Sequence, residues 1–211
     1  MAFPTTYSGW ITYIRDWLAA DEYSDAQIAS FLDLAQLRLN REMESYGMEA
    51  VATITVLDLD PIDITAVIAD FNKVRLVSVP GIGPLTSMAI NEIKRELETK
   101  NTDGNPAQYF CIDAGKLYTY PKMSDGTIDL FYYRLIPYMS KTPAVDSNVF
   151  STKYQDALLY AGLLAAAPYM KDTEFMSVWS EAYAAALITA NNDAKHIKLG
   201  STPLKREVKV Q

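Results

Sequence analysis

The chain has 211 residues, 49% of them hydrophobic and 21% charged, with nine Gly and ten Pro, which excludes a disordered, collagen-like or low-complexity polypeptide. At about 150 residues per domain, this length favours one domain, with or without an appendage. The formal net charge of -7 disfavours nucleic-acid binding as the main task, because a surface that grips phosphate needs clustered cations.

Two helices are predicted near the N-terminus. An apolar stripe at helical spacing predicts the first over about residues 8–20. Ser24 and Gln27 form a capping box that predicts the start of the second, which we expect over about residues 24–46 with Gly47 as its stop.

Two alanine-rich helices are predicted near the C-terminus, over about residues 152–167 and 173–192. Ser151 or Thr152 can cap the first of them. Because alanine permits close contact between helices, we expect both to pack against the 24–46 helix as the core of a bundle.

The region between these helices, about residues 50–135, predicts β-structure. Residues 51–59 and 73–79 are rich in β-branched side chains, and a Gly-Pro turn at residues 80–84 precedes a short helix that we expect to begin at Ser87.

Three later runs, residues 109–112, 116–120 and 127–134, are separated by turn residues and predict a three-stranded meander. The predicted fold class is therefore α+β, with a helical bundle formed by the N- and C-terminal helices and an inserted antiparallel β-sheet.

The C-terminal residues 195–211 differ in charge from the rest of the chain. They hold one anion and five cations, a net +4, so residues 1–194 carry -11. Because Gly200 and Pro203 interrupt helical periodicity, we expect an extended basic C-terminal arm beyond a single domain of residues 1–194. The cations proposed to bind a partner are Lys195, Lys198, Lys205, Arg206 and Lys209.

Catalytic and metal-binding patterns are weak. Cys111 is the single cysteine and His196 the single histidine, so a zinc set of His and Cys is excluded, and we expect no catalytic residue and no cofactor.

The longest apolar run, residues 157–170, is shorter than the 18 or so residues of a membrane span. The N-terminus lacks the basic segment that a secretory signal begins with, so we expect no such signal. We also expect no contact with a membrane.

Two loops superficially resemble ligand sites. Asp58, Asp60 and Asp63 suggest a calcium loop, but the Gly and the closing Glu of that motif are missing, which favours solvated carboxylates at a strand end. Gly81 and Gly83 follow a strand as in a dinucleotide loop, but a third glycine is missing, which favours a tight hairpin.

Acidic and aromatic side chains leave further alternatives open. Carboxylate pairs such as Glu42 and Glu44 are predicted on polar helix faces and leave a small carboxylate-dependent hydrolase as a less favoured alternative. Eight aromatic rings fall within residues 109–138, and rings on a second sheet face suit a protein interface or a second core face. The candidates for a subunit or tail interface are Tyr118, Tyr120, Tyr132 and Tyr133.

Several strings resemble, in order and spacing, the adaptor (head-to-tail connector) proteins of tailed phages. The most specific block lies within residues 131–183, and the similarity spans roughly residues 28–204. The matching segments are Phe131 to Pro137, Tyr154 to Asp172, Trp179 with Tyr183, Gly200 to Leu204, and upstream Leu37 to Met43, Ala69 to Phe71, and Pro84 with Leu85.

The resemblance implies a structural virion protein without enzymatic activity, assembled in the host cytoplasm and located at the neck, the head-tail junction. About twelve copies would form a ring below the portal protein, extend the DNA channel and provide the attachment platform for a tail or nozzle protein. The acidic residues 1–194 would let DNA pass through the lumen without specific binding. The basic arm would bind the portal or a neighbouring subunit. The alternative is another neck or tail-tube component.

Overall fold

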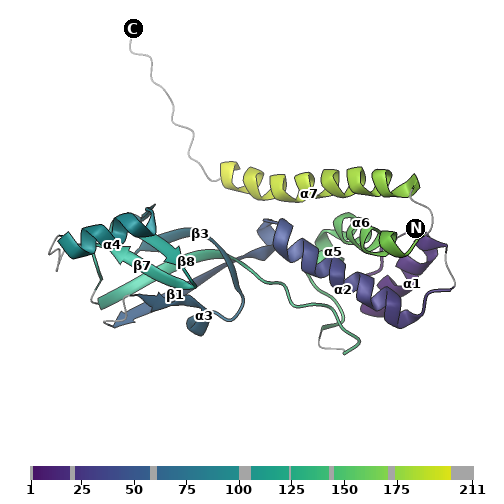
Figure 1. Ribbon diagram of the computed structural model, residues 1–211, viewed down its shortest axis with the longest axis horizontal. Helices are drawn as coiled ribbons and strands as arrows, with labels where there is room; N and C mark the ends of the chain where they lie inside the picture. The colour runs from purple at the N-terminus through teal and green to yellow at the C-terminus, as the bar shows by residue number, and fades with distance from the viewer. Residues whose placement is uncertain are drawn as a thin grey trace, which may run out of the picture. The chain divides into compact units, whose positions relative to one another are not determined.

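The computed structural model describes residues 2–19, 22–57, 61–99, 106–123, 125–142, 145–170 and 174–200. The chain divides into two compact units. Residues 1–48 and 136–211 form the first, here called the helical unit, and residues 49–135 form the second, the β-rich unit (Figure 1). The inserted region that we predicted inside one domain of residues 1–194 is thus a compact unit of its own.

The helical unit is built from both ends of the chain. Its helices are α1 (Tyr7–Leu18), α2 (Asp25–Glu42), α5 (Val149–Lys153), α6 (Gln155–Ala166) and α7 (Glu174–Gly200), with single 3-10 turns η1 (Tyr46–Met48) and η3 (Ala167–Tyr169). The capping box of Ser24 and Gln27 is present at the start of α2. The predicted helix over residues 152–167 is instead two helices, and Asn148 caps α5 because its side chain accepts a hydrogen bond from the Ser151 backbone N–H.

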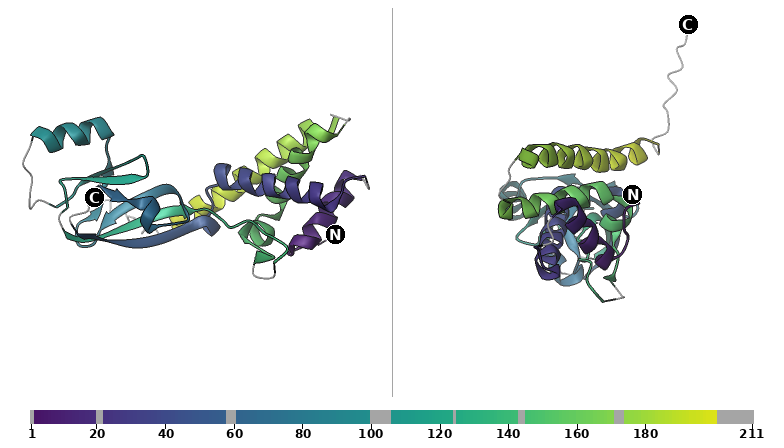
Figure 2. Two further views of the ribbon diagram at one scale, coloured as in Figure 1. Left: turned by 60° about the horizontal axis from the view of Figure 1, so that its bottom comes forward. Right: turned by 90° about the vertical axis from the view of Figure 1, so that its right-hand side faces the viewer.

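Helix α6 is the centre of the helical unit. It packs against α2 on one side and α7 on the other, and Figure 2 shows it between them. Its buried positions surround the helix, which is typical of a helix enclosed by its neighbours. At Gly162, an added Cβ would lie 3.0 Å from Cδ1 of Ile14, so glycine permits the close approach of α1. Both C-terminal helices thus contact α2, since α6 packs along it and α7, which packs mainly on α6, reaches it through Tyr183.

Helix α7 is longer than its sequence pattern predicts, since it continues to Gly200 and not to about residue 192. The segment between Asp193 and Leu199 contains Ala, Lys and Leu, which favour helix, and no Gly or Pro before residue 200. Lys195 and Lys198 are thus helical positions, and an extended arm that begins at residue 195 is wrong for residues 195–200. Residues 201–211 of the predicted arm lie outside the described residues.

The described part of the β-rich unit contains two four-stranded sheets, ordered β1-β8-β3-β4 and β2-β7-β6-β5. The strands are β1 (Glu49–Leu57), β2 (Ile62–Asp63), β3 (Phe71–Val79), β4 (Gly83–Pro84), β5 (Thr86–Ser87), β6 (Tyr109–Asp113), β7 (Lys116–Tyr120) and β8 (Asp125–Arg134), and the helices are α3 (Ile64–Val67) and α4 (Ile90–Thr99). Ser87 ends a strand, so the predicted helix begins three residues later.

The predicted three-stranded meander is wrong. Strands β6 and β7 form an antiparallel hairpin in one sheet, but β8 lies in the other sheet, antiparallel to both β1 and β3. Ile128, Leu130 and Tyr132 alternate along β8 and join the buried cluster shared with Val56 and Leu117. A strand with such a buried face is most stable in the centre of a sheet, where both of its edges are paired. The inserted antiparallel sheet is present as β1-β8-β3-β4, and the described residues form a second sheet that holds the parallel pair β5–β6.

The α+β class itself is confirmed, with helices from both ends of the chain and β-structure between them. Among the described helices, none has the length and apolar character that crossing a membrane requires.

Candidate functional site

The residue types that most often act in catalysis or bind metals, cysteine and histidine, occur once each, as Cys111 and His196. Cys111 lies half-buried on β6, and burial, together with the nearby Asp113 carboxylate, raises the pKa of its thiol and disfavours the reactive thiolate. The side chain of His196 lies outside the described residues. Within the described ranges, no group of three His, Cys, Asp or Glu side chains could hold a metal ion.

The two ligand-like loops are structural where they are described. Asp63 caps α3, since its carboxylate accepts hydrogen bonds from the Thr65 hydroxyl at 2.7 Å and the Ala66 backbone N–H at 3.1 Å, and the first of these bonds lowers the pKa of Asp63. Asp58 and Asp60 lie outside the described residues. Gly81 and Gly83 adopt φ values of 82° and 107° in the turn from β3 to β4, so the tight hairpin is confirmed.

One carboxylate of the predicted acidic pairs, Glu42, belongs to a network that joins α2 and α7. Its side chain accepts a hydrogen bond from the Tyr183 hydroxyl at 2.8 Å and forms an ion pair with Arg38 at 3.1 Å. The Arg38 guanidinium also lies 4.6 Å over the Tyr183 ring. Burial, followed by the hydrogen bond to Glu42, raises the pKa of Tyr183, so its hydroxyl remains a donor. This arrangement serves packing between helices.

The four tyrosines predicted at an interface are mostly core residues. Tyr120, Tyr132 and Tyr133 are buried, with exposed fractions of 8%, 6% and 6%. The Tyr132 hydroxyl donates to Asp70 at 2.9 Å, and the Tyr120 hydroxyl donates to Glu96 at 3.4 Å. Tyr118 is half-buried, with the Lys94 ammonium 6.0 Å from its ring centre. Neither Tyr120 nor Tyr132 faces outward, because Tyr132 belongs to the buried cluster of the β-rich unit and the Tyr120 side chain reaches Glu96 of α4.

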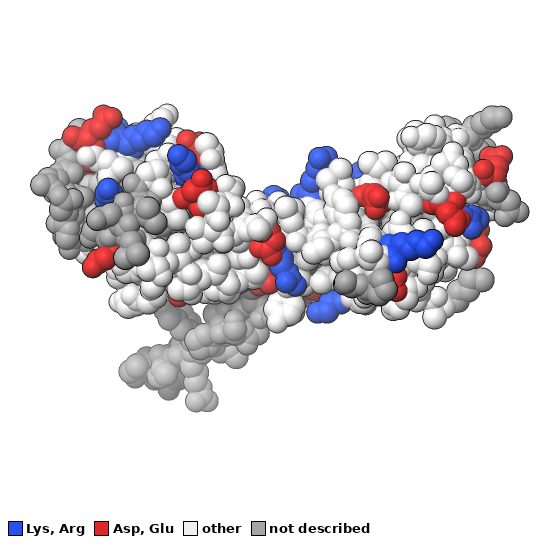
Figure 3. Space-filling model, turned by 90° about the horizontal axis from the view of Figure 1, so that it is seen from below, with Lys and Arg blue, Asp and Glu red and all other residues white. Residues whose placement is uncertain are grey.

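Charged side chains are dispersed on the surface. On the face that Figure 3 shows, Lys and Arg lie singly or in small groups beside Asp and Glu, between wide uncharged areas. A surface that grips a phosphate backbone would instead concentrate cations. The coloured residues of this face show no such concentration.

A groove of about 420 Å³ lies on the helical unit between α2 and α6. We call it the α2/α6 groove, and it is lined by Leu34, Leu37, Arg38 and Arg41 of α2 and by Leu164 and Ala165 of α6. Leu34 is 48% exposed, so the apolar lining is accessible. The groove combines an apolar floor with arginine side chains, which suits a protein partner.

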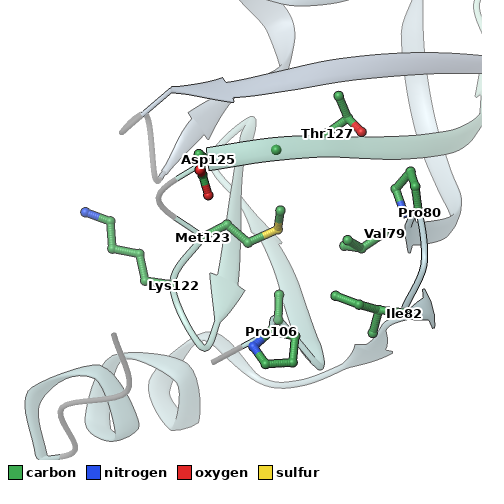
Figure 4. A pocket seen from close by; sticks show the side chains of 10 residues that line it. Val79, Pro80, Ile82, Pro106, Lys122, Met123, Asp125 and Thr127 are labelled. Atoms are coloured by element: carbon green, nitrogen blue, oxygen red, sulfur yellow. The ribbon is translucent and has the colours of Figure 1, made fainter. Parts of the chain in front are cut away.

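A second hollow, of about 400 Å³, lies in the β-rich unit between the β3–β4 turn and the segment that precedes β8. In Figure 4, Val79, Ile82 and Met123 point toward the same space, whereas the Lys122 side chain extends away from it. Ile82, at the edge of this hollow, is 48% exposed. The lining thus mixes apolar side chains with the polar Asp125 and Thr127.

The alanine-rich C-terminal helices were expected to offer a face to a neighbouring subunit, but no exposed residue on the outer side of α7 was named for it. Trp179 and Tyr183 are buried against the bundle, whereas Phe175, Val178 and Ile188 are 51%, 59% and 62% exposed. A sequence signal for this surface exists, because Glu181 is the only charged residue between residues 175 and 192. Exposed helix faces usually carry many charges, so a nearly uncharged one indicates a contact surface.

The α2/α6 groove and the outer side of α7 suit contact with other proteins. The sequence matches the family of the SU10 adaptor protein over residues 5–205. The chain belongs to the SU10 adaptor family. This is a family of phage head-tail adaptors, so the resemblance seen in the sequence is confirmed. No curated protein matches the chain. As an SU10 adaptor, the protein has a structural role in the phage virion, where it contacts other virion components.

Proposed function

We propose that this SU10 adaptor forms a ring of about twelve copies below the portal, at the neck of the particle. The ring extends the DNA channel and provides the platform to which a tail or nozzle protein attaches. The observation that carries the proposal is the family match over residues 5–205, which includes both the helical and the β-rich unit.

The charge distribution supports this arrangement. Residues 1–194 carry a net charge of -11, and an acidic lumen repels the DNA phosphates so that DNA slides past without sticking. The C-terminal cations then act on a protein partner, either the portal or a neighbouring subunit. Lys195 and Lys198 occupy the last turns of α7, and Lys205, Arg206 and Lys209 follow in the sequence.

The test is to mix the purified chain with DNA-free portal rings of the same phage and to examine the product by native mass measurement and electron microscopy. We expect the chain alone to have a low mass and the portal to carry one added ring of about twelve copies. A reconstruction of the intact particle that places the chain in the tail tube, or portal rings that stay bare at micromolar chain concentrations, would contradict the proposal.

A further inference from the structure

Two surfaces of the helical unit match each other. The outer side of α7 is apolar around Val178 and Ile188, and its one charge between residues 175 and 192 is the anion of Glu181. Leaving such a surface in water costs free energy that burial against another apolar surface recovers. This side of α7 needs a partner that is apolar with a local positive charge.

The α2/α6 groove has that chemistry. Leu34 and Leu164 supply apolar surface, and Arg38 and Arg41 supply two cations, against one anion, Glu42. Glu42 is engaged with Arg38 at 3.1 Å, so the balance of charge along the groove is positive. An incoming glutamate beside Arg41 would be attracted and would tolerate desolvation better than an unpaired carboxylate.

The groove is shorter than the apolar side of α7. At about 1.5 Å per residue, the α2 wall from Leu34 to Arg41 is about 10 Å long, and the α7 side from Val178 to Ile188 is about 15 Å long. The groove therefore holds about two turns of a helix, with Glu181 inside the segment that it would receive.

One copy of the chain cannot bring these surfaces together. Tyr183 points from α7 toward α2, because its hydroxyl reaches Glu42 at 2.8 Å. Val178 and Ile188 lie five residues before and after Tyr183, and about 100° per residue places each of them about 140° around the helix from it. The apolar side of α7 thus faces away from the α2 wall of its own groove, so it can enter only the groove of another copy.

We propose that the outer side of α7 in one copy docks into the α2/α6 groove of the next copy, and that this is the contact between subunits of the ring. The inference rests on the proposed ring. Because the two surfaces differ, the contact is heterologous and leaves one free groove and one free helix side at each end of a chain of copies. Such a contact propagates until the ring closes, and neither surface remains exposed.

The test uses Leu34→Asp in the groove and Ile188→Asp on α7, both at exposed positions, so folding is retained. The matched control is Val67→Asp on α3, which is 56% exposed and lies on neither surface. Each variant is titrated onto DNA-free portal rings, and added rings are counted by electron microscopy. Tryptophan fluorescence during urea unfolding checks the fold.

We expect each groove or α7 variant to need about tenfold more protein for a complete ring, equivalent to about 1.4 kcal/mol, and the control to match the wild type. Glu181→Arg and Arg41→Glu should each weaken assembly, and the double variant should assemble better than either. Complete wild-type rings with Leu34→Asp and Ile188→Asp equally competent would overturn the docking but leave the ring proposal standing. Failure of the wild-type chain to form any ring would instead reject the proposed function, and the docking with it.

Discussion

Asn40 is the side chain whose loss should most clearly weaken the helical unit through hydrogen bonding. It lies on α2, only 3% exposed. Its side-chain amide donates to the Ile136 carbonyl at 3.0 Å, and its carbonyl oxygen accepts from the Ile136 N–H at 2.8 Å. Ile136 is itself 3% exposed. A single side chain thus satisfies both backbone groups of a buried residue 96 positions away in the sequence.

Asn40→Ala removes both bonds and leaves the two Ile136 backbone groups without these partners in a buried place. Each buried group left unsatisfied costs about 1–3 kcal/mol, so the loss of two partners should lower the free energy of unfolding by about 2–6 kcal/mol. The neighbouring Arg41→Ala is the matched control, because Arg41 is exposed on the same helix. A surface substitution of this kind should change stability by less than about 0.5 kcal/mol.

Urea unfolding, monitored by tryptophan fluorescence, reports on the helical unit, where Asn40 lies. The sequence holds three tryptophans, Trp10, Trp17 and Trp179, and all belong to the helical unit. We expect the midpoint of the transition to fall for Asn40→Ala while its slope m is retained. An unfolding free energy within about 0.5 kcal/mol of the wild type, at equal m, would refute the reasoning.

Three further outcomes are expected. Leu158→Asp places an unpaired charge at a fully buried position of α6, so the helical unit should lose its cooperative unfolding transition; a soluble variant with unchanged melting temperature would contradict the packing. Burial and the hydrogen bond to Asp70 raise the pKa of Tyr132 to about 12 in the folded chain, so this contribution to stability is present below pH 10 and is lost as the pH rises toward 12. Between pH 10 and pH 12, the free energy of unfolding of Tyr132→Phe should therefore fall less than that of the wild type. Equal falls would disprove the link between the raised pKa of Tyr132 and stability. Deleting residues 201–211 should weaken docking onto DNA-free portal rings in a salt-dependent way, whereas normal docking with altered DNA retention would assign these residues to nucleic acid.

Features set by short stretches of sequence were predictable. The Ser24 capping box acts within four residues, and the glycines of the β3–β4 turn act through their own backbone angles, so both were identified from the sequence. Helix ends were less predictable. The expected cap at Ser151 or Thr152 is displaced by Asn148, because Ser151 occupies the N3 position of the capping box and Asn148 is its N-cap.

Pairing between distant strands could not be predicted in the same way. The turn before β8 suggests that it continues the β6–β7 hairpin, since neighbouring strands in sequence often pair. In the structure, Ile54 of β1 instead lies opposite Ile128 of β8, 74 positions later. That choice depends on which sheet leaves a central position open for a strand with one buried face, and no single stretch of sequence carries this information.

The contrast between the tyrosines and α7 shows why ring density alone does not indicate which aromatic side chains are exposed. Aromatic rings fill cores and interfaces for the same reason, the large area they bury, so the ring density around Tyr120 and Tyr132 could not separate the two. Charge is a better discriminator for a helix on the outside of a bundle, because solvent exposure without a partner normally brings Lys, Glu, Arg or Asp. With Glu181 as the one charge between residues 175 and 192, α7 combines a buried side at Trp179 and Tyr183 with a second apolar side that faces away from the bundle. A helix that is apolar on two sides is explained by two packing partners, and the helical unit supplies one of them.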